Sequence, residues 1–94
     1  TRQHTLIIPK RHVVDYFDLT EPEIAAIHQM LTAMRNRIKN DDLTVNGFNI
    51  GVNAGKTAGQ SISHVHVHLI PRRQGDVENP QGGVRGVIPN KQKY

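Results

Sequence analysis

The chain has 94 residues, enough for one domain, and its hydrophobic content of 36% is that of a folded protein. It contains no cysteine, which excludes disulfides, thiolate metal ligands and a cysteine nucleophile. It has neither a signal-peptide pattern nor an apolar run near the roughly 20 residues of a membrane span, so we expect a cytoplasmic protein with no membrane partner. The net charge of +4 favours an anionic partner, but the positive residues are scattered and Trp is absent, so we expect no stable nucleic-acid partner.

The first half of the chain predicts a short strand followed by a long helix. Residues 4–9, His-Thr-Leu-Ile-Ile-Pro, form a β-rich run that ends at proline. Thr20 lies three residues before Glu23, which is the capping-box pattern of a helix start, and Pro22 falls in the first turn. Apolar residues then recur at spacings of three and four, which predicts an amphipathic helix of about five turns. The members of this stripe are Ile24, Ile27, Leu31, Met34 and Ile38. The stripe fits packing on the protein's own sheet, and a seam with a partner helix is compatible with it.

The second half predicts two more strands. Residues 47–53 alternate, with Phe48, Ile50 and Val52 on one face and Asn53 on the other. Residues 54–63 form a loop by composition, and a strand from His64 to Ile70 is expected to end at Pro71. The remaining tail has no period and is expected to be extended coil. The predicted fold class is therefore α+β, an antiparallel sheet with one main helix packed on it.

Three of the six histidines, His64, His66 and His68, alternate along the last predicted strand. Alternation places them on one face of the sheet, roughly 6.5–7 Å apart from one to the next. Their apolar neighbours Val65, Val67 and Leu69 take the face that the helix can cover. Histidine is a mediocre strand former, and neighbouring imidazoles repel one another when protonated, so the pattern indicates chemistry rather than stability.

Two kinds of chemistry fit such a row of imidazoles. They could bind a catalytic zinc ion, although side chains from alternate positions of one strand do not easily converge on one ion and no carboxylate candidate stands nearby. Alternatively, a neutral histidine could attack phosphorus while its neighbours donate hydrogen bonds to the phosphoryl oxygens. The preceding loop, with its small residues and with Ser61 and Ser63, suits close approach to a phosphate, or is a plain connector. Its Gly-Lys-Thr string is not a P-loop, because the glycine spacing is too short and a strand follows.

The stretch GFNIGVNAGKTAGQSISHVHVHLIPRR, residues 47–73, resembles the histidine triad family, whose signature is His-x-His-x-His flanked by apolar residues. The stretch HTLIIPKRHV, residues 4–13, resembles the strand and turn before the central helix of that family. The match looks closest to the branch of hydrolases that act on nucleotides and dinucleoside polyphosphates. The resemblance implies the histidine triad fold and a homodimer. We expect activity without a metal or other cofactor, because three in-phase imidazoles suit a phosphoryl group better than a single ion. The resemblance also implies that the single domain over residues 1–94 begins after the family's N-terminal hairpin, which carries a ribose-binding carboxylate and much of the base pocket.

The resemblance further implies a mechanism and a role for each matching residue. His66 attacks the α-phosphorus of a nucleotide, a nucleotidyl-histidine forms, and water then releases the monophosphate. His68 contacts the phosphate oxygens and His64 supports the row. The other residues expected to bind substrate are Asn53, Gln60, Ser61 and His4, the last of which backs the triad.

We therefore expect a nucleotide hydrolase or transferase that cleaves at the α-phosphate of a nucleoside phosphate conjugate, such as a dinucleoside polyphosphate or a phosphoramidate. The alternatives are a non-catalytic nucleotide-binding or protein-interaction module and a zinc hydrolase. Arg85 in the tail could reach a polyphosphate or remain a solvated surface residue.

Overall fold

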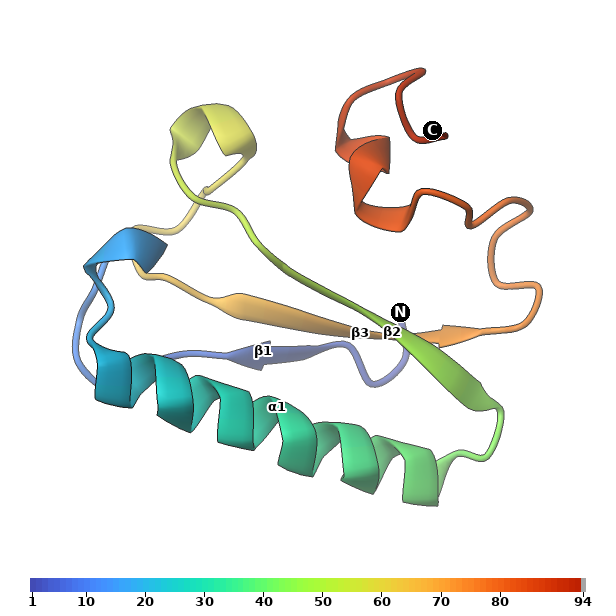
Figure 1. The fold of residues 1–94 in the computed structure, drawn as a ribbon, viewed down its shortest axis with the longest axis horizontal. Helices are drawn as coiled ribbons and strands as arrows, with labels where there is room; N and C mark the ends of the chain where they lie inside the picture. The colour runs from blue at the N-terminus through green and yellow to red at the C-terminus, as the bar shows by residue number, and fades with distance from the viewer. Residues whose placement is uncertain (94) are drawn as a thin grey trace.

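The computed structural model describes residues 1–93, which form a three-stranded antiparallel sheet with a long helix on one face (Figure 1). The elements in chain order are β1 (Thr5–Ile7), η1 (Tyr16–Asp18), α1 (Glu21–Asp41), β2 (Val45–Val52), η2 (Lys56–Ala58), β3 (Val67–Arg73) and η3 (Gly83–Val87), where η marks a short 3-10 helix. The strand order is β1-β3-β2, so β3 is central and pairs antiparallel with both neighbours. The predicted α+β class is confirmed.

The long helix α1 begins as the sequence predicts. The Thr20 side chain accepts a hydrogen bond from the backbone N–H of Glu23, and the Glu23 carboxylate accepts one from the backbone N–H of Thr20. Of the apolar stripe, Ile27 and Ile38 are buried and Leu31 and Met34 are partly buried, whereas Ile24 in the first turn stays 42% exposed. Within residues 1–93, no helix has both the length and the apolar character that a membrane crossing requires.

The core lies between α1 and the sheet. Val65, Val67 and Leu69 are only 1%, 3% and 1% exposed, and they face α1. Ile27 packs in one cluster with Val65 and Val67, and Ile38 packs in a second cluster with Leu69. The alternation predicted for this segment is confirmed, because its histidines are less buried than the residues between them.

The predicted bounds of the histidine strand are wrong at both ends. The strand was expected from His64 to Ile70, but β3 starts at Val67, because the N–H of Val65 bonds to the carbonyl of Val13 outside the sheet. The strand also continues through Pro71, which pairs with Phe48 of β2. Proline is tolerated here because β1 pairs only with residues 67–69, so β3 has a single neighbour at this point and resembles an edge strand.

The loop and the tail contain more structure than their composition predicts. The loop over residues 54–63 includes η2, and the tail, expected to be extended coil, includes η3. Glycines permit both turns, since Gly59 after η2 and Gly82 before η3 have φ values of 96° and 88° in the left-handed region. Both segments stand over the face of the sheet opposite α1, with η2 toward one end and η3 toward the other (Figure 1).

Leu69→Ala should lower the free energy of unfolding by about 2–5 kcal/mol, because it leaves a cavity beneath the central strand. Leu43→Ala is the matched control, since Leu43 is 90% exposed, and it should change stability by less than about 0.5 kcal/mol. Urea unfolding followed by circular dichroism measures both. Equal losses for the two variants would contradict the packing described here.

Candidate active site

The histidine row lies on the face of β3 that α1 does not cover. Because Val67 and Leu69 are committed to the core, the side chains between them and on either side must point to the opposite face. In the β1–β3 ladder, Leu6 pairs with His68, which brings the chain just before β1 alongside the histidine row. This pairing explains how His4, 64 residues away in sequence, reaches His68.

Three imidazoles form a continuous cluster on this face. His4 Nε2 lies 2.9 Å from His68 Nδ1, and the two ring centroids are 5.1 Å apart. The ring centroids of His66 and His68 are also 5.1 Å apart. The structure thus places His68 between His4 and His66, and a proton can be shared along the His4–His68 pair.

The environment of His66 fixes which of its ring nitrogens carries a proton. Its Nδ1 lies 3.0 Å from the backbone carbonyl oxygen of His64. A carbonyl oxygen can only accept, so Nδ1 must be the protonated nitrogen. In the neutral ring, Nε2 of His66 then holds an unprotonated lone pair, which is the form that a nucleophile requires.

The side chain of His64 is turned to a different neighbour. Its Nε2 lies 3.1 Å from the carbonyl oxygen of Pro9 and therefore donates to it. Its ring also meets the ring of His12 edge to face, at a centroid distance of 5.2 Å. The backbone carbonyl of His64 thus accepts a hydrogen bond from His66, while its ring contacts the segment that follows β1. His12 belongs to no periodic pattern, so nothing in the sequence marks it.

One ring nitrogen of His68, Nε2, is buried without a hydrogen-bond partner among residues 1–93. Burial lowers the pKa of His68, and the nearby rings of His4 and His66 lower it further. Unpaired buried polar atoms are costly, and an unpaired ring nitrogen in a ring that lies next to two other imidazoles fits a position that a polar ligand occupies.

Asn53 shares a cavity with the imidazole cluster. This cavity has a volume of about 270 Å³, and its lining includes His4, His68, Asn53 and, from the tail, Val84. A larger cavity of about 600 Å³ shares Asn53 and Val84 with it and extends beneath η3. Asn53 lies one residue beyond the end of β2, and its contact with substrate stays a prediction. Val84 was not predicted, since the tail carries no pattern that would mark it.

Gln60 and Ser61 are placed differently from the imidazole cluster. The side-chain oxygen of Gln60 accepts from the N–H of Gly55 at 2.9 Å, and its nitrogen donates to the carbonyls of Val14 and Ile62 at 2.7 and 3.1 Å. The Gln60 amide therefore holds the loop in shape. Ser61 is exposed and lines a separate recess beside Gln60, so direct substrate contact by these two residues stays a prediction.

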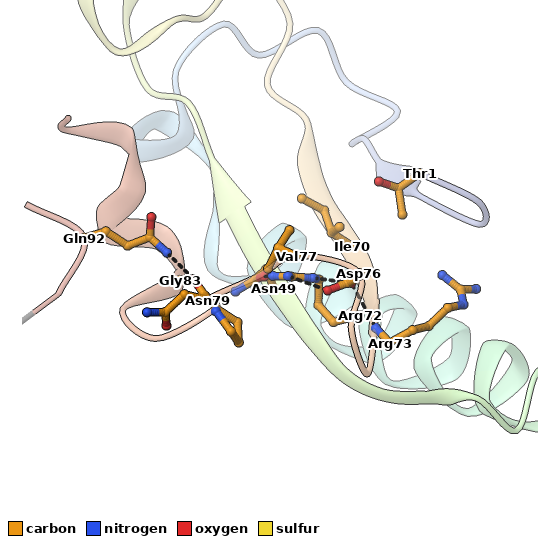
Figure 2. A pocket seen from close by; sticks show the side chains of 11 residues that line it. Thr1, Asn49, Ile70, Arg72, Arg73, Asp76, Val77, Asn79, Gly83 and Gln92 are labelled. Atoms are coloured by element: carbon orange, nitrogen blue, oxygen red, sulfur yellow. Dashed lines mark hydrogen bonds and ion pairs between the residues drawn. The ribbon is translucent and has the colours of Figure 1, made fainter. Parts of the chain in front are cut away.

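An arginine network borders the site at the other end of β3. Arg72 donates to the side-chain oxygen of Asn49 at 2.6 Å and makes two hydrogen bonds to the Asp76 carboxylate, at 2.8 and 2.9 Å (Figure 2). The Arg72 guanidinium holds the pKa of the Asp76 carboxyl well below its usual range. Arg72 is therefore committed to protein partners, and it fixes the orientation of the Asn49 amide.

Metal ligation has little geometric support among the described residues. No group of three or more histidine, aspartate or glutamate side chains within residues 1–93 is arranged to hold an ion. The imidazole cluster instead offers a lone pair at His66 and a buried nitrogen at His68, which suits a tetrahedral phosphoryl group with a reactive centre and several oxygens.

Comparison with known proteins agrees with this arrangement. The sequence pattern of the HIT domain family matches residues 1–75. An uncharacterized HIT-like protein of Mycobacterium tuberculosis is 42% identical over 80 residues, which cover 81% of this chain and 52% of that protein. A bis(5′-adenosyl)-triphosphatase of Dictyostelium discoideum is 38% identical over 77 residues, covering 81% of this chain and 50% of that protein. A crystal structure of a zinc-bound histidine triad family protein from Mycobacterium smegmatis has a TM-score of 0.73 at 39% identity, covering 81% of this chain and 55% of that one.

The chain belongs to the HIT, or histidine triad, family, as its sequence resemblance predicted. The similarity to solved HIT proteins also confirms the predicted arrangement of one main helix on an antiparallel sheet. The chain spans about half the length of the curated relatives it matches. Relatives of the chain include hydrolases and phosphorylases named for dinucleoside polyphosphates.

A bound phosphate should raise the pKa of His68. In the free protein we expect His68 to become cationic only below the usual histidine pKa of about 6.5, because burial and neighbouring imidazoles disfavour its charge. A phosphate dianion favours the charge and opposes both effects. Imidazole NMR titration of the full-length protein with and without AMP measures the shift. AMP should leave the resonance of His28, exposed on α1, unmoved. A His68 titration that AMP does not alter would show that His68 faces no phosphate.

Proposed function

We propose that the protein is a nucleotide hydrolase or transferase that acts at the α-phosphate through a nucleotidyl-histidine on His66. The observation that carries the proposal is the hydrogen bond from His66 Nδ1 to the carbonyl of His64, which leaves Nε2 as a lone pair beside His68. This arrangement needs no separate base to activate the nucleophile, because the reactive nitrogen is already unprotonated.

In the first step, the Nε2 lone pair of His66 forms a bond to the α-phosphorus, and the bond from phosphorus to the leaving oxygen breaks. The leaving group takes that electron pair and departs. A water molecule or another acceptor then attacks the same phosphorus, the P–N bond breaks, and the electron pair returns to Nε2 of His66. The proton that the attacking oxygen loses passes to the solvent.

His68 suits the role of stabilising charge on the phosphoryl oxygens. If His4 Nε2–H donates to Nδ1 of His68, the proton of His68 lies on its buried Nε2, where it can be donated to an oxygen. Such a preorganised donor in a water-poor site acts as the charge develops in the transition state. His4 is then a positioning residue, since it acts through His68.

The relatives support the substrate class. The Dictyostelium discoideum protein is named for the hydrolysis of a dinucleoside triphosphate, and a Mycobacterium tuberculosis relative that is 39% identical over 74 residues is named an AP-4-A phosphorylase. We therefore propose a nucleoside phosphate conjugate as substrate, such as a dinucleoside polyphosphate or a phosphoramidate. A non-catalytic nucleotide-binding module is the second candidate, because the same cavity could hold a nucleotide without turnover.

We also propose that the protein is a cytoplasmic homodimer. The family resemblance is the main support for the dimer. Physically, β2 is an edge strand, and Ile50 on β2 and Met30 on α1 remain 53% and 49% exposed, so a second copy has apolar surface to cover. Sedimentation analysis of the full-length protein tests this assembly.

His66→Ala should abolish turnover of a dinucleoside polyphosphate, with a loss of at least about 10³-fold, because no other group replaces the lone pair. Nucleotide binding should survive, since His68 and Asn53 remain. Steady-state release of AMP and equilibrium binding of AMP measure the two effects. His28→Ala, which removes an exposed histidine from α1, is the control and should keep the parental rate. Parental turnover by His66→Ala would refute the proposed nucleophile, and absence of turnover in the parental protein would favour the binding module.

Treatment with a chelator should leave the rate unchanged, because the proposed nucleophile is a histidine lone pair rather than a metal-bound water. The measurement is AMP release by the full-length protein before and after dialysis against EDTA. Loss of activity that one equivalent of zinc restores would support the zinc-hydrolase alternative instead, and a zinc-bound histidine triad protein is among the solved structures.

A further inference from the structure

The tail brings an additional element to the site. η3 stands over the face of the sheet that carries the histidines, beside β2 (Figure 1). Its residue Val84 lines both the cavity that contains His4 and His68 and the larger cavity beneath the tail. The proposed chemistry at phosphorus uses neither Val84 nor the larger cavity.

Specific contacts seat the tail on β2. Gly82 and Gly83 have φ values of 88° and 45°, and a methyl group on Gly83 would lie only 3.1 Å from the side-chain nitrogen of Asn49. The side chain of Gln92 donates to the carbonyls of Asn79 and Gln81, each at 3.2 Å, and thereby closes the tail back on itself. Figure 2 shows Gln92, Asn79 and Gly83 gathered next to Asn49. η3 therefore approaches β2 closely at Gly83 and Asn49, and hydrogen bonds within the tail hold its shape.

The larger cavity is uncharged. Its volume of about 600 Å³ lies in the range of small-molecule sites. The amides of Asn49 and Asn53 and the Thr57 hydroxyl provide polar groups, and Val84 and the end of η3 provide apolar surface. No charged side chain lines it, so it suits a neutral group with a flat ring and hydroxyls better than a phosphate. Because Arg72 occupies the side-chain oxygen of Asn49, the Asn49 amide nitrogen remains as the donor.

The two cavities adjoin each other on the face of the sheet that carries the histidines. They share Asn53 and Val84, and the smaller one reaches His68. On the opposite side of His68, Leu6 and Ile8 from the β1 side leave 54% and 58% of their surface exposed. A phosphate centre flanked by uncharged surface on two sides fits a substrate with a nucleoside at each end of its phosphate chain.

We infer that the cavity under the tail binds the nucleoside of the leaving group, and that Val84 is a specificity-determining residue that favours dinucleoside polyphosphates. This inference rests on the proposed function. The roof of the cavity is open, since Val84 and Val87 are 59% and 78% exposed, and an open cavity suits the half of the substrate that departs before water attacks. The half bound to His66 must stay in place through that step.

The test compares two substrates that transfer the same AMP group. Diadenosine triphosphate releases ADP, which carries a nucleoside, whereas ATP releases pyrophosphate, which does not. In the full-length protein, Val84→Asp should lower the ratio of kcat/KM for diadenosine triphosphate to kcat/KM for ATP by about tenfold or more, because it puts a charge into an uncharged pocket. Val84→Ala should lower this ratio less, and Val77→Ala, a matched loss of two methyl groups outside both cavities, should leave it unchanged.

A binding measurement separates this inference from the catalytic proposal. In a His66→Ala background, the methyl NMR signals of Val84 should shift much more on addition of diadenosine triphosphate than on addition of ATP. This expectation holds whether or not the parental protein hydrolyses these substrates. An unchanged substrate ratio in both Val84 variants, or an equal loss for both substrates, would overturn the assignment to the leaving group. Equal methyl shifts with the two ligands would overturn it as well. AMP release that does not depend on His66 would overturn only the proposed function.

Discussion

The two-residue repeat of β3 is the constraint on which the site depends. Successive side chains of a strand point to opposite faces, so once Val65, Val67 and Leu69 are buried against α1, the neighbouring histidines cannot turn inward. A shift of one residue in register would bury the imidazoles and expose the core. The hydrophobic free energy that holds the sheet to the helix therefore also keeps the imidazoles on the open face. The same alternation over residues 64–70 sets both the stability and the geometry of the site.

Backbone carbonyl groups, rather than side chains, orient two of the histidine rings. The carbonyl of His64 selects the tautomer of His66, and the carbonyl of Pro9 fixes the ring of His64. A carbonyl cannot change its role with pH, whereas a carboxylate or a second imidazole can. A histidine ring oriented in this way keeps its Nε2 unprotonated whenever the ring is neutral. Nearby, burial disfavours the charge on His68.

The loop and the tail flank the site on two sides, and a glutamine side chain helps to hold each of them. Gln60 ties the loop to the segment after β1, and Gln92 ties the tail to itself above Asn49. Side-chain amides suit this task because one group can donate and accept at once, which satisfies backbone atoms that no sheet or helix pairs. Both segments line the larger cavity, with Thr57 from the loop and Val84 and Val87 from the tail.

The helix with its Thr20 and Glu23 cap, the α+β class and the row of histidines on one face could all be predicted from the sequence. Each follows from a local pattern whose physical cause acts within a few residues: capping, a helical repeat, or strand alternation. The histidine triad resemblance added His4, which no local pattern connects to His68. The extension of β3 through Pro71 could not be predicted, because it depends on β1 ending early. The contact of the His66 ring with His68, and of the His64 ring with His12, likewise depends on how distant segments pack. The place of Val84 beside the histidines could not be predicted either, because contacts between residues far apart in sequence leave no periodic pattern in the tail.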